Sequence, residues 1–164
     1  EQISLASTEA SGTGNMKLMM NGAITLGTED GANVEIHSAV GDDNIIIFGM
    51  QTPEVLSLQK NGYSPMQYYN NNPELKEALD FIGRGIAGQP FDNIYNSLKN
   101  NDRYMALADF ADYRKAQKKA SELYNNKEVW SKMSLTNIAK SGIFAADRSI
   151  EDYARDIWHV KPID

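Results

Sequence analysis

The sequence contains no cysteine, only two histidines and no long hydrophobic run. Without cysteine the chain can form no disulfide, zinc–thiolate site or cysteine nucleophile, which is typical of a cytoplasmic protein. The two histidines, His37 and His159, have no neighbouring pattern of metal ligands, so we expect no metal site. No apolar run approaches the ~20 residues that span a bilayer, and the chain does not open on a signal-peptide pattern. We therefore expect a soluble, cytoplasmic protein with no membrane partner.

Positive charge is also scarce. The chain has 16 lysines and arginines against 22 aspartates and glutamates, a formal net charge of -6 and an isoelectric point near 4.9. This balance argues against nucleic acid or an anionic membrane as the main partner. Any anion that the chain binds must be held locally, by backbone amides and a few placed side chains.

The first part of the chain, residues 1–50, favours an α/β structure. Short apolar runs at 23–26 and 44–48 predict buried strands, and the segment 33–40 between them predicts a short helix that Gly41 ends. Strand, helix and strand in this order are typical of a parallel crossover unit. Two parallel strands cannot form a whole sheet, so we expect either that partner strands are missing or that the chain begins within a domain.

The second part, residues 51–164, favours helices. Capping residues followed by proline, capping-box patterns and glycines predict where these helices begin and end. The predicted starts are Thr52-Pro53, Ser64-Pro65, Asn72-Pro73 and Ser149–Asp152, and the predicted ends are Gly62 and Gly142. Apolar side chains at helical spacing predict two packing faces. One face holds Tyr113, Ala116, Ala120, Leu123 and Tyr124, and the other holds Tyr153, Ala154, Ile157 and Trp158.

The most informative stretch is Ser11-Gly-Thr-Gly-Asn-Met-Lys17, in which two glycines and two hydroxyl side chains precede a lysine. We expect a helix to begin near Gly14, so that Lys17 lies one turn in and its side chain points back toward the N-terminal end. The unpaired backbone N–H groups of that end, with the hydroxyls of Ser11 and Thr13 beside them, suit a phosphate.

A lysine amine beside a phosphate site suits a cofactor with both an aldehyde and a phosphate, because such an amine forms an imine with a carbonyl. Pyridoxal phosphate meets both requirements. The large apolar residues at 16 and 18–20 are expected to lower the exposure of Lys17. The alternative is a common turn and helix cap followed by a lysine that reaches solvent. The glycines fit neither a dinucleotide fingerprint, since no strand is evident before Gly12, nor a P-loop, since Leu18 replaces the serine or threonine.

The stretch Thr8–Lys17, together with Asn21–Ala23 and Gly31–Glu35, closely resembles the α-glucan phosphorylases, which act on glycogen, starch or maltodextrin. The resemblance continues as far as Tyr153–Arg155 and covers essentially the whole chain. It implies the C-terminal portion of a longer two-domain glycosyltransferase of the GT-B kind. That fold is Rossmann-like and of the α/β class, and this portion would be mostly helical with a short parallel strand pair. The missing sheet partners then have an explanation.

The resemblance also implies roles for individual residues. Lys17 corresponds to the lysine that holds pyridoxal phosphate as a Schiff base, so that it anchors the cofactor. Glu9 corresponds to a glutamate that orients the glucosyl unit, and these two are the expected catalytic residues. The expected cofactor-binding residues are Lys17, Gly12, Thr13 and Gly14, and the expected substrate-binding residues are Glu9, Ser11 and Gly12.

The implied reaction is the reversible phosphorolysis of a terminal bond of an α-1,4-glucan by inorganic phosphate, which releases α-glucose 1-phosphate with retained configuration. In the family the phosphate of the cofactor, rather than the imine, takes part in proton transfer. The basic residues of the family that grip the phosphates lie upstream, so we expect the isolated chain to be inactive. The full-length protein is expected to be a homodimer. Glu29 departs from the family, in which an apolar residue is expected at this position.

Two other readings remain open from the residues. The chain could be a non-enzymatic helical domain that binds a partner through its acidic C-terminal half. It could also be a different pyridoxal enzyme, such as an aminotransferase, in which the imine itself reacts. Failure of Lys17 to bind any carbonyl cofactor would favour the first reading, and displacement of Lys17 by an amino acid would favour the second.

Overall fold

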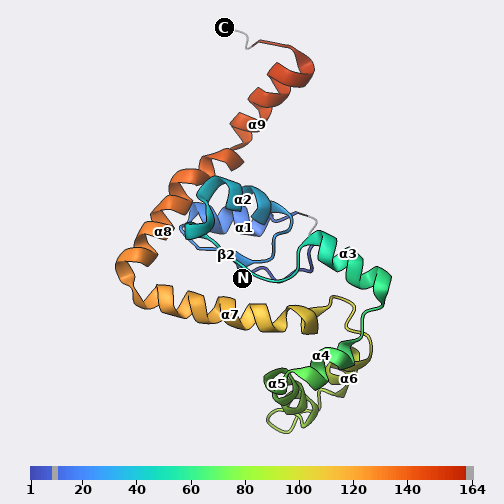
Figure 1. Cartoon of the computed structure of the whole chain (residues 1–164). Coiled ribbons are helices and arrows are strands. Elements are labelled where there is room, and N and C mark those ends of the chain that lie inside the picture. Colours follow the sequence, from blue (N-terminus) through green and yellow to red (C-terminus); the bar gives the residue numbers. More distant parts are fainter. Residues whose placement is uncertain (9–10, 162–164) are drawn as a thin grey trace.

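The computed structural model describes residues 1–8 and 11–161. These residues are mostly helical, and their two short strands form a parallel sheet (Figure 1), as the sequence predicts. The elements are α1 (Thr13–Met20), β1 (Leu26–Gly27), α2 (Ala32–Val40), η1 (Asp42–Asn44), β2 (Ile46–Ile47), α3 (Thr52–Asn61), α4 (Pro65–Asn71), α5 (Pro73–Gly83), α6 (Asp92–Asn100), α7 (Ala106–Asn125), α8 (Lys127–Lys140), η2 (Ser141–Phe144), α9 (Ala146–Tyr153) and η3 (Ala154–Trp158). Among the described residues, no helix is long and apolar enough to cross a membrane.

The two strands pair in parallel, with Leu26 opposite Ile46, and α2 connects them. On β1, Gly27 also pairs with Gln2 in an isolated parallel bridge. Both strands are shorter than predicted. The N–H of Ala23 donates to the carbonyl of Leu18 (3.0 Å), which holds the start of the first predicted strand in the turn after α1. The second begins late because Asn44 lies in the 3₁₀ turn η1.

Helices cover both faces of the sheet, because successive residues of a strand point to opposite sides. On one face, α7 packs Ala116 and its apolar neighbours against Leu26, Ile46 and Phe48. On the other, α1 and α2 pack together around Ile45, with Met19 and Ile36 fully buried. The predicted face of α7 is confirmed for all residues except the last: Tyr124 is 54% exposed and lies edge-on to Trp130.

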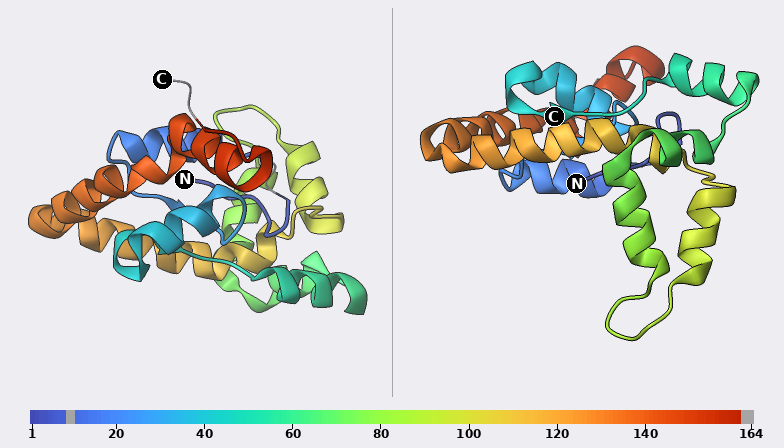
Figure 2. Two further views of the ribbon diagram at one scale, coloured as in Figure 1. Left: turned by 90° about the horizontal axis from the view of Figure 1, so that it is seen from above. Right: turned by 60° about the horizontal axis from the view of Figure 1, so that its bottom comes forward.

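Helices α4, α5 and α6 form a separate bundle, and α5 and α6 project from the body as a hairpin (Figure 2). Its apolar core contains Tyr69, Leu75, Leu79 and, from α7, Leu107. The predicted start at Asn72 is confirmed, because its side chain accepts hydrogen bonds from the N–H groups of Glu74 and Leu75, both 3.1 Å. These bonds satisfy donors at the helix start that would otherwise lack a partner.

Two other predicted caps differ in detail. Helix α3 begins at Thr52, but Gln51 is its N-cap, and the carboxylate of Glu54 accepts from the Gln51 N–H (2.7 Å). Helix α4 follows Ser64 as predicted, yet the Ser64 side chain makes no capping hydrogen bond. Gly62 ends α3 with a positive φ of 93°, which confirms that helix end.

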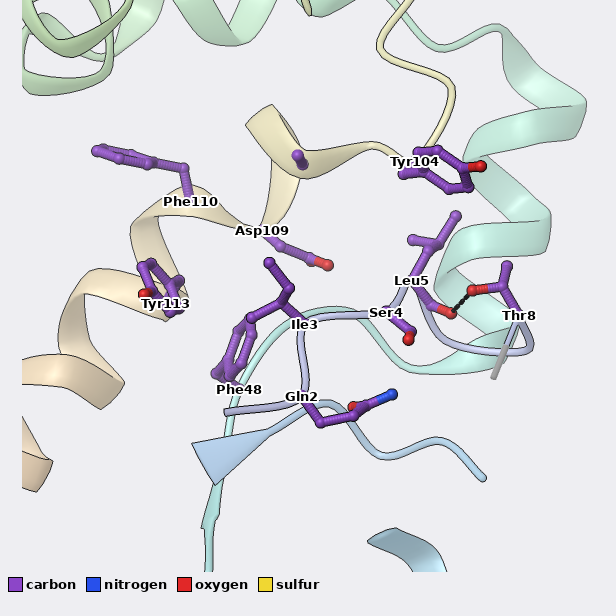
Figure 3. Close-up of a pocket in the computed structure, with 11 residues that line it drawn as sticks. Gln2, Ile3, Ser4, Leu5, Thr8, Phe48, Tyr104, Asp109, Phe110 and Tyr113 are labelled. Carbon is purple, nitrogen blue, oxygen red and sulfur yellow. Dashed lines mark hydrogen bonds between the residues drawn. The ribbon is translucent and has the colours of Figure 1, made fainter. Parts of the chain in front are cut away.

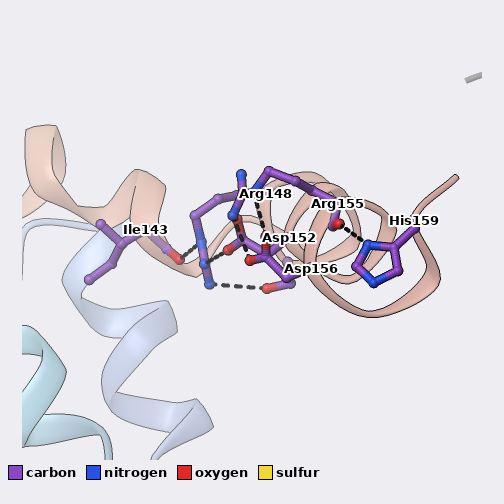
Figure 4. A network of polar contacts seen from close by, with 7 residues as sticks. Ile143, Arg148, Asp152, Arg155, Asp156 and His159 are labelled. Carbon is purple, nitrogen blue, oxygen red and sulfur yellow. Dashed lines mark hydrogen bonds and ion pairs between the residues drawn. The ribbon is translucent and has the colours of Figure 1, made fainter. Parts of the chain in front are cut away.

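The predicted start of the last helix is wrong, and the helix end predicted at Gly142 is found there but is continued by a 3₁₀ turn. Helix α9 begins at Ala146, before the predicted start at Ser149, and the Arg148 guanidinium pairs with Asp152 one turn on and donates to the Ile143 carbonyl (2.6 Å; Figure 4). These bonds join the start of α9 to η2, and the helix therefore begins before the capping pattern at Ser149. Gly142 does not end α8 as a left-handed cap, because the chain continues directly into the 3₁₀ turn η2.

The predicted packing face of the last helix is exposed in this structure. Helix α9 and the π-helical turn η3 extend away from the body (Figure 1). Tyr153, Ile157 and Trp158 are 48%, 62% and 54% exposed. The rings of Tyr153 and Trp158 stack on each other, with their centroids 5.5 Å apart. The apolar spacing of this face was read correctly, but no described element packs on it.

Glu29, the residue that departs from the family pattern, pairs with a histidine. Its carboxylate lies 2.9 Å from Nδ1 of His37, and the other ring nitrogen, Nε2, lies 2.6 Å from the Asp42 carboxylate. Partial burial opposes protonation of His37, but the hydrogen bonds to Asp42 and Glu29 outweigh it and raise the pKa of His37 above 6.5. The imidazolium therefore links the segment before α2 to the turn after it.

We predict that His37→Gln lowers stability at acidic pH only. Because the folded-state pKa is raised, the stabilisation is fully present below the unfolded pKa of about 6.5 and is lost as pH rises through the folded value. A partly exposed ion pair of this kind contributes about 0.5–1 kcal/mol. Urea unfolding at pH 5.5 and pH 9 should show a difference between wild type and His37→Gln at the lower pH that disappears at the higher.

The matched control is His159→Gln, because Nδ1 of His159 lies 2.9 Å from the backbone carbonyl of Arg155 and not from a carboxylate. This variant should follow wild type at both pH values. An equal loss of stability in His37→Gln at pH 5.5 and pH 9 would contradict the charged bridge.

Candidate functional site

The glycine and hydroxyl stretch forms the start of α1, within one residue of the predicted position. Gly12 is the N-cap residue and takes the left-handed conformation, with φ 66°. The hydroxyl oxygens of Ser11 and Thr13 lie 2.7 Å apart and form a hydrogen bond with each other. Since the first N–H groups of an α-helix have no partner within the helix, this end combines backbone donors with two hydroxyl groups. The sequence therefore predicted the local structure of this segment correctly.

Lys17 lies on the same face of α1 as the first two helical residues, Thr13 and Gly14. It follows Thr13 by four residues and Gly14 by three, spacings that place side chains on one face of a helix. The Lys17 side chain is exposed, and its backbone carbonyl accepts a hydrogen bond from the Asn21 side chain (2.8 Å). The amine and the hydroxyl pair thus belong to one exposed surface.

The expected shielding of Lys17 by its apolar neighbours is wrong in this structure. Only Met19 is buried, where it faces the core opposite Lys17. Leu18 and Met20 are 54% and 56% exposed. A short helix that packs on one side leaves its other side chains uncovered, so apolar character alone did not identify the buried positions.

The other predicted substrate residue, Glu9, lies outside the residues that the structure describes. The segment just before it is fixed: the N–H of Thr8 donates to the Asp30 carboxylate (2.9 Å), and the Thr8 hydroxyl donates to the Leu5 carbonyl (2.6 Å). Asp30 precedes α2, so α2 and the segment that leads to the site are held together.

The two glycines of the stretch have different surroundings. A Cβ on Gly12 would lie 2.4 Å from the Cβ of Ala32, the first residue of α2, whereas a Cβ on Gly14 would have no atom within 4 Å. Gly12 therefore permits the close approach of α2 and supplies the left-handed turn. Gly14 instead leaves open space beside the first turn of α1, on the side of Lys17.

Two residues that hold this site were not identified from the sequence. Asn15, in the first turn of α1, donates from Nδ2 to Oδ1 of Asn33 in α2 (2.7 Å). Asn33 is fully buried. Nearly all buried polar groups in proteins are hydrogen-bonded. The sequence around an asparagine in a helix does not, however, indicate which residues are its partners.

A cavity of about 780 Å³ lies elsewhere, between residues 1–8 and the start of α7 (Figure 3). Its walls are mostly apolar and include Ile3, Phe48 and Phe110, and none of residues 11–17 lines it. Asp109 also lines it. Burial raises the pKa of that carboxyl, against the opposing effect of the hydrogen bond from the Met50 N–H (2.8 Å). Size alone would direct attention to this cavity, but the predicted chemistry lies at α1.

Comparison with known proteins identifies a family for nearly the whole chain, including α1 and the cavity. The family model described as "Carbohydrate phosphorylase" matches residues 1–160. The chain belongs to the carbohydrate phosphorylase family. It is 51% identical over 168 aligned residues to the liver form of glycogen phosphorylase from Bos taurus, covering 100% of this chain and 20% of that protein. It is 49% identical over 166 residues to the muscle form from Homo sapiens, covering 99% of this chain and 20% of that protein.

The chain therefore spans about a fifth of the length of these relatives. The resemblance to the phosphorylases that the motif predicts is confirmed at the level of the family. The match to the family model includes every residue that the sequence analysis singled out, from Glu9 to Lys17. Roles for those residues are not part of the match and are taken up as proposals.

The glycine contacts give a prediction for folding. Gly12→Ala should lower the free energy of unfolding by about 2–4 kcal/mol, since it adds both left-handed strain and a steric overlap with Ala32. Gly14→Ala should leave it within about 1 kcal/mol of wild type, because alanine favours the helix and meets open space. Urea unfolding of the two variants side by side measures the difference. Equal effects at the two positions would contradict the described packing of α2 on Gly12.

Proposed function

We propose that this chain is part of a pyridoxal phosphate-dependent α-1,4-glucan phosphorylase, which releases α-glucose 1-phosphate from terminal α-1,4 bonds with retained configuration. The observation that carries the proposal is that Lys17 and Thr13 share one exposed face of α1, with the Ser11 hydroxyl bonded to Thr13 just before the helix, in a chain of the carbohydrate phosphorylase family. Relatives at about half identity are glycogen phosphorylases.

The residues present fit this cofactor. A phosphate needs several hydrogen-bond donors, and the start of α1 offers backbone N–H groups and two hydroxyls. An aldehyde needs an amine within reach, and Lys17 supplies one from the same face. The open space beside Gly14 gives room for a ring between these groups. Lys17, Gly12, Thr13 and Gly14 are therefore the proposed cofactor-binding residues.

In the proposed mechanism each residue of the chain has a positioning or binding role. Lys17 would hold the cofactor through its amine. The N–H groups and hydroxyl at Thr13 and Gly14 orient the cofactor phosphate and favour its anionic form. Glu9, Ser11 and Gly12 bind sugar hydroxyls and orient the glucosyl unit, which lowers the entropic cost of reaching the transition state. When bound, the cofactor supplies a phosphate that exchanges a proton with the substrate phosphate.

The remaining expectations from the family are part of the same proposal. The chain would be the C-terminal portion of a longer GT-B glycosyltransferase, with residues 1–50 at the end of an α/β sheet and residues 51–164 in the helical part of the same domain. The full-length protein would be a cytoplasmic homodimer. The exposed apolar face of α9 and η3 supports a larger assembly, because exposed apolar clusters of this kind are normally covered.

The cofactor assignment predicts a covalent label at Lys17. Borohydride reduction of the protein as it occurs in its source, followed by peptide mapping, should give a phosphopyridoxyl group on Lys17. Lys17→Arg keeps the charge but cannot form the covalent link, so it should give no labelled peptide. An unlabelled Lys17 in a cofactor-replete protein would refute the assignment and return Lys17 to a solvent-exposed helix residue.

Substrate assays separate the remaining readings. A labelled Lys17 together with phosphate-dependent release of glucose 1-phosphate from an α-1,4-glucan supports the proposal. Displacement of Lys17 by an amino acid, seen as a change of the cofactor spectrum, would indicate instead an enzyme in which the imine reacts.

The isolated chain of residues 1–164 should show no phosphorolysis, even with added cofactor. Its site offers Lys17 as the cation beside the two hydroxyls, and two bound phosphates need more positive charge than this. Release of glucose 1-phosphate from glycogen and phosphate, measured against a full-length glycogen phosphorylase as the positive control, tests this. Measurable turnover by the isolated chain would contradict it.

A further inference from the structure

Asn33 lies at the centre of a buried polar cluster that joins three segments of the chain. Its Nδ2 donates to Oε1 of Gln2 (2.8 Å) and to the carbonyl of Thr28 (2.9 Å). Its Oδ1 accepts from Nδ2 of Asn15 (2.7 Å). The amide orientation is therefore determined, because only this way round do both atoms find partners of the right kind. The cluster ties the first turn of α1 to the sheet through α2.

The backbone around Asn33 leaves this amide no alternative position. A Cβ on Gly27, in β1, would lie 2.5 Å from Asn33 Nδ2 and 2.9 Å from the Gln2 carbonyl oxygen. Gly27 thus lets the amide lie directly against the strand. One residue earlier in α2, Ala32 lies against Gly12 with equally little room. The first turn of α2 is held between β1 and the turn that precedes α1.

The two ends of α1 are held in different ways, the C-terminal end by core packing and the start by α2. Met19 is fully buried in the core near the C-terminal end of α1. At the start, the N-cap residue Gly12 has no side chain to cap the helix. The Asn15–Asn33 hydrogen bond adds a directional contact between this first turn and α2, beside the close approach of Ala32 to Gly12. Asn15 lies two residues before Lys17, so this contact also bears on where the lysine side chain leaves the helix.

We infer that Asn33, acting through Asn15, is the positioning residue for the cofactor site at the start of α1. It touches neither cofactor nor substrate, and it holds the hydroxyl pair and Lys17 in the one geometry in which a phosphate and an aldehyde of the same molecule are bound together. Binding sites need their groups held within about 0.5 Å, a tolerance that a helix start free to tilt does not meet. This inference rests on the proposed function, since it concerns the same cofactor.

The experiment measures cofactor affinity and stability in the same variants of the full-length protein as its source makes it. Asn15→Ala and Asn15→Leu each remove the donor to Asn33. Asn15 is half-buried, so both variants should fold. The control is Thr28→Val, which has nearly the same shape and is fully buried in the same cluster. It loses the hydroxyl, whose single proton is shared between the Ser4 carbonyl (2.8 Å) and Gln2 Oε1 (3.1 Å), but no hydrogen bond to α1.

Both Asn15 variants should raise the dissociation constant of pyridoxal phosphate for the apoprotein at least tenfold and lower kcat more than they change KM for the glucan. Thr28→Val should lower the urea midpoint at least as much as the Asn15 variants do. It should leave the dissociation constant of pyridoxal phosphate within twofold of wild type. A purely structural role for the cluster would instead make the dissociation constant follow the urea midpoint in all three variants.

The possible failures are distinguishable. If wild type carries the cofactor on Lys17 but the Asn15 variants bind it as wild type does, or if Thr28→Val weakens binding equally, the positioning role is overturned and the proposed function stands. If wild type carries no cofactor on Lys17, both are overturned, and the borohydride map of wild type alone reveals this.

Discussion

The rest of the structure depends on one constraint, the close approach of α2 to two glycines, Gly12 and Gly27. Ala32 and Asn33 occupy the space that a Cβ would fill at Gly12 and at Gly27. Since interiors are packed to crystal density, two such contacts in one helical turn fix α2 against both the sheet and the start of α1. This turn therefore joins the sheet to the helix that carries Lys17.

The negative net charge of the chain means that an anion can be bound only by local hydrogen-bond donors. A chain with a formal charge of -6 does not attract an anion through its overall field, so the proposed phosphate site would depend on the few groups at the start of α1. The acidic groups near α2 are compensated separately. Glu29 and Asp42 pair with His37, and the Asp30 carboxylate accepts the Thr8 N–H. Their charge is thus used in local bonds.

The parts of the fold that could be predicted are those set by neighbours in sequence. The start of α1 followed from glycines and hydroxyls within a few residues, and the helix start at Asn72 from its own side chain. The parallel pair followed from two apolar runs and their spacing. The exact strand ends did not, because they depend on bonds such as Ala23 to Leu18.

What could not be predicted depends on partners distant in sequence or absent from the chain. Asn33 bonds to residues 31 and 18 positions away, Gln2 and Asn15, and no periodicity encodes those distances. Ser149 has a capping pattern, yet Arg148 bonds start the helix earlier. Trp158 lies on an apolar face, but whether that face is buried depends on what packs against it. Local chemistry therefore predicted the start of α1, and only the structure revealed which distant residues hold it.

The hairpin of α5 and α6 has a consequence for the motion of the molecule. Its core is closed mainly by its own residues and α4, with Leu107 and Phe110 contributed by α7, and among the described residues it shares no buried cluster with the sheet. A unit with its own core opens at a lower free-energy cost than the whole protein. The hairpin is therefore expected to open more readily than the sheet and α1. Its amide hydrogens would exchange with solvent in a separate, faster class, on a time scale unrelated to events at Lys17.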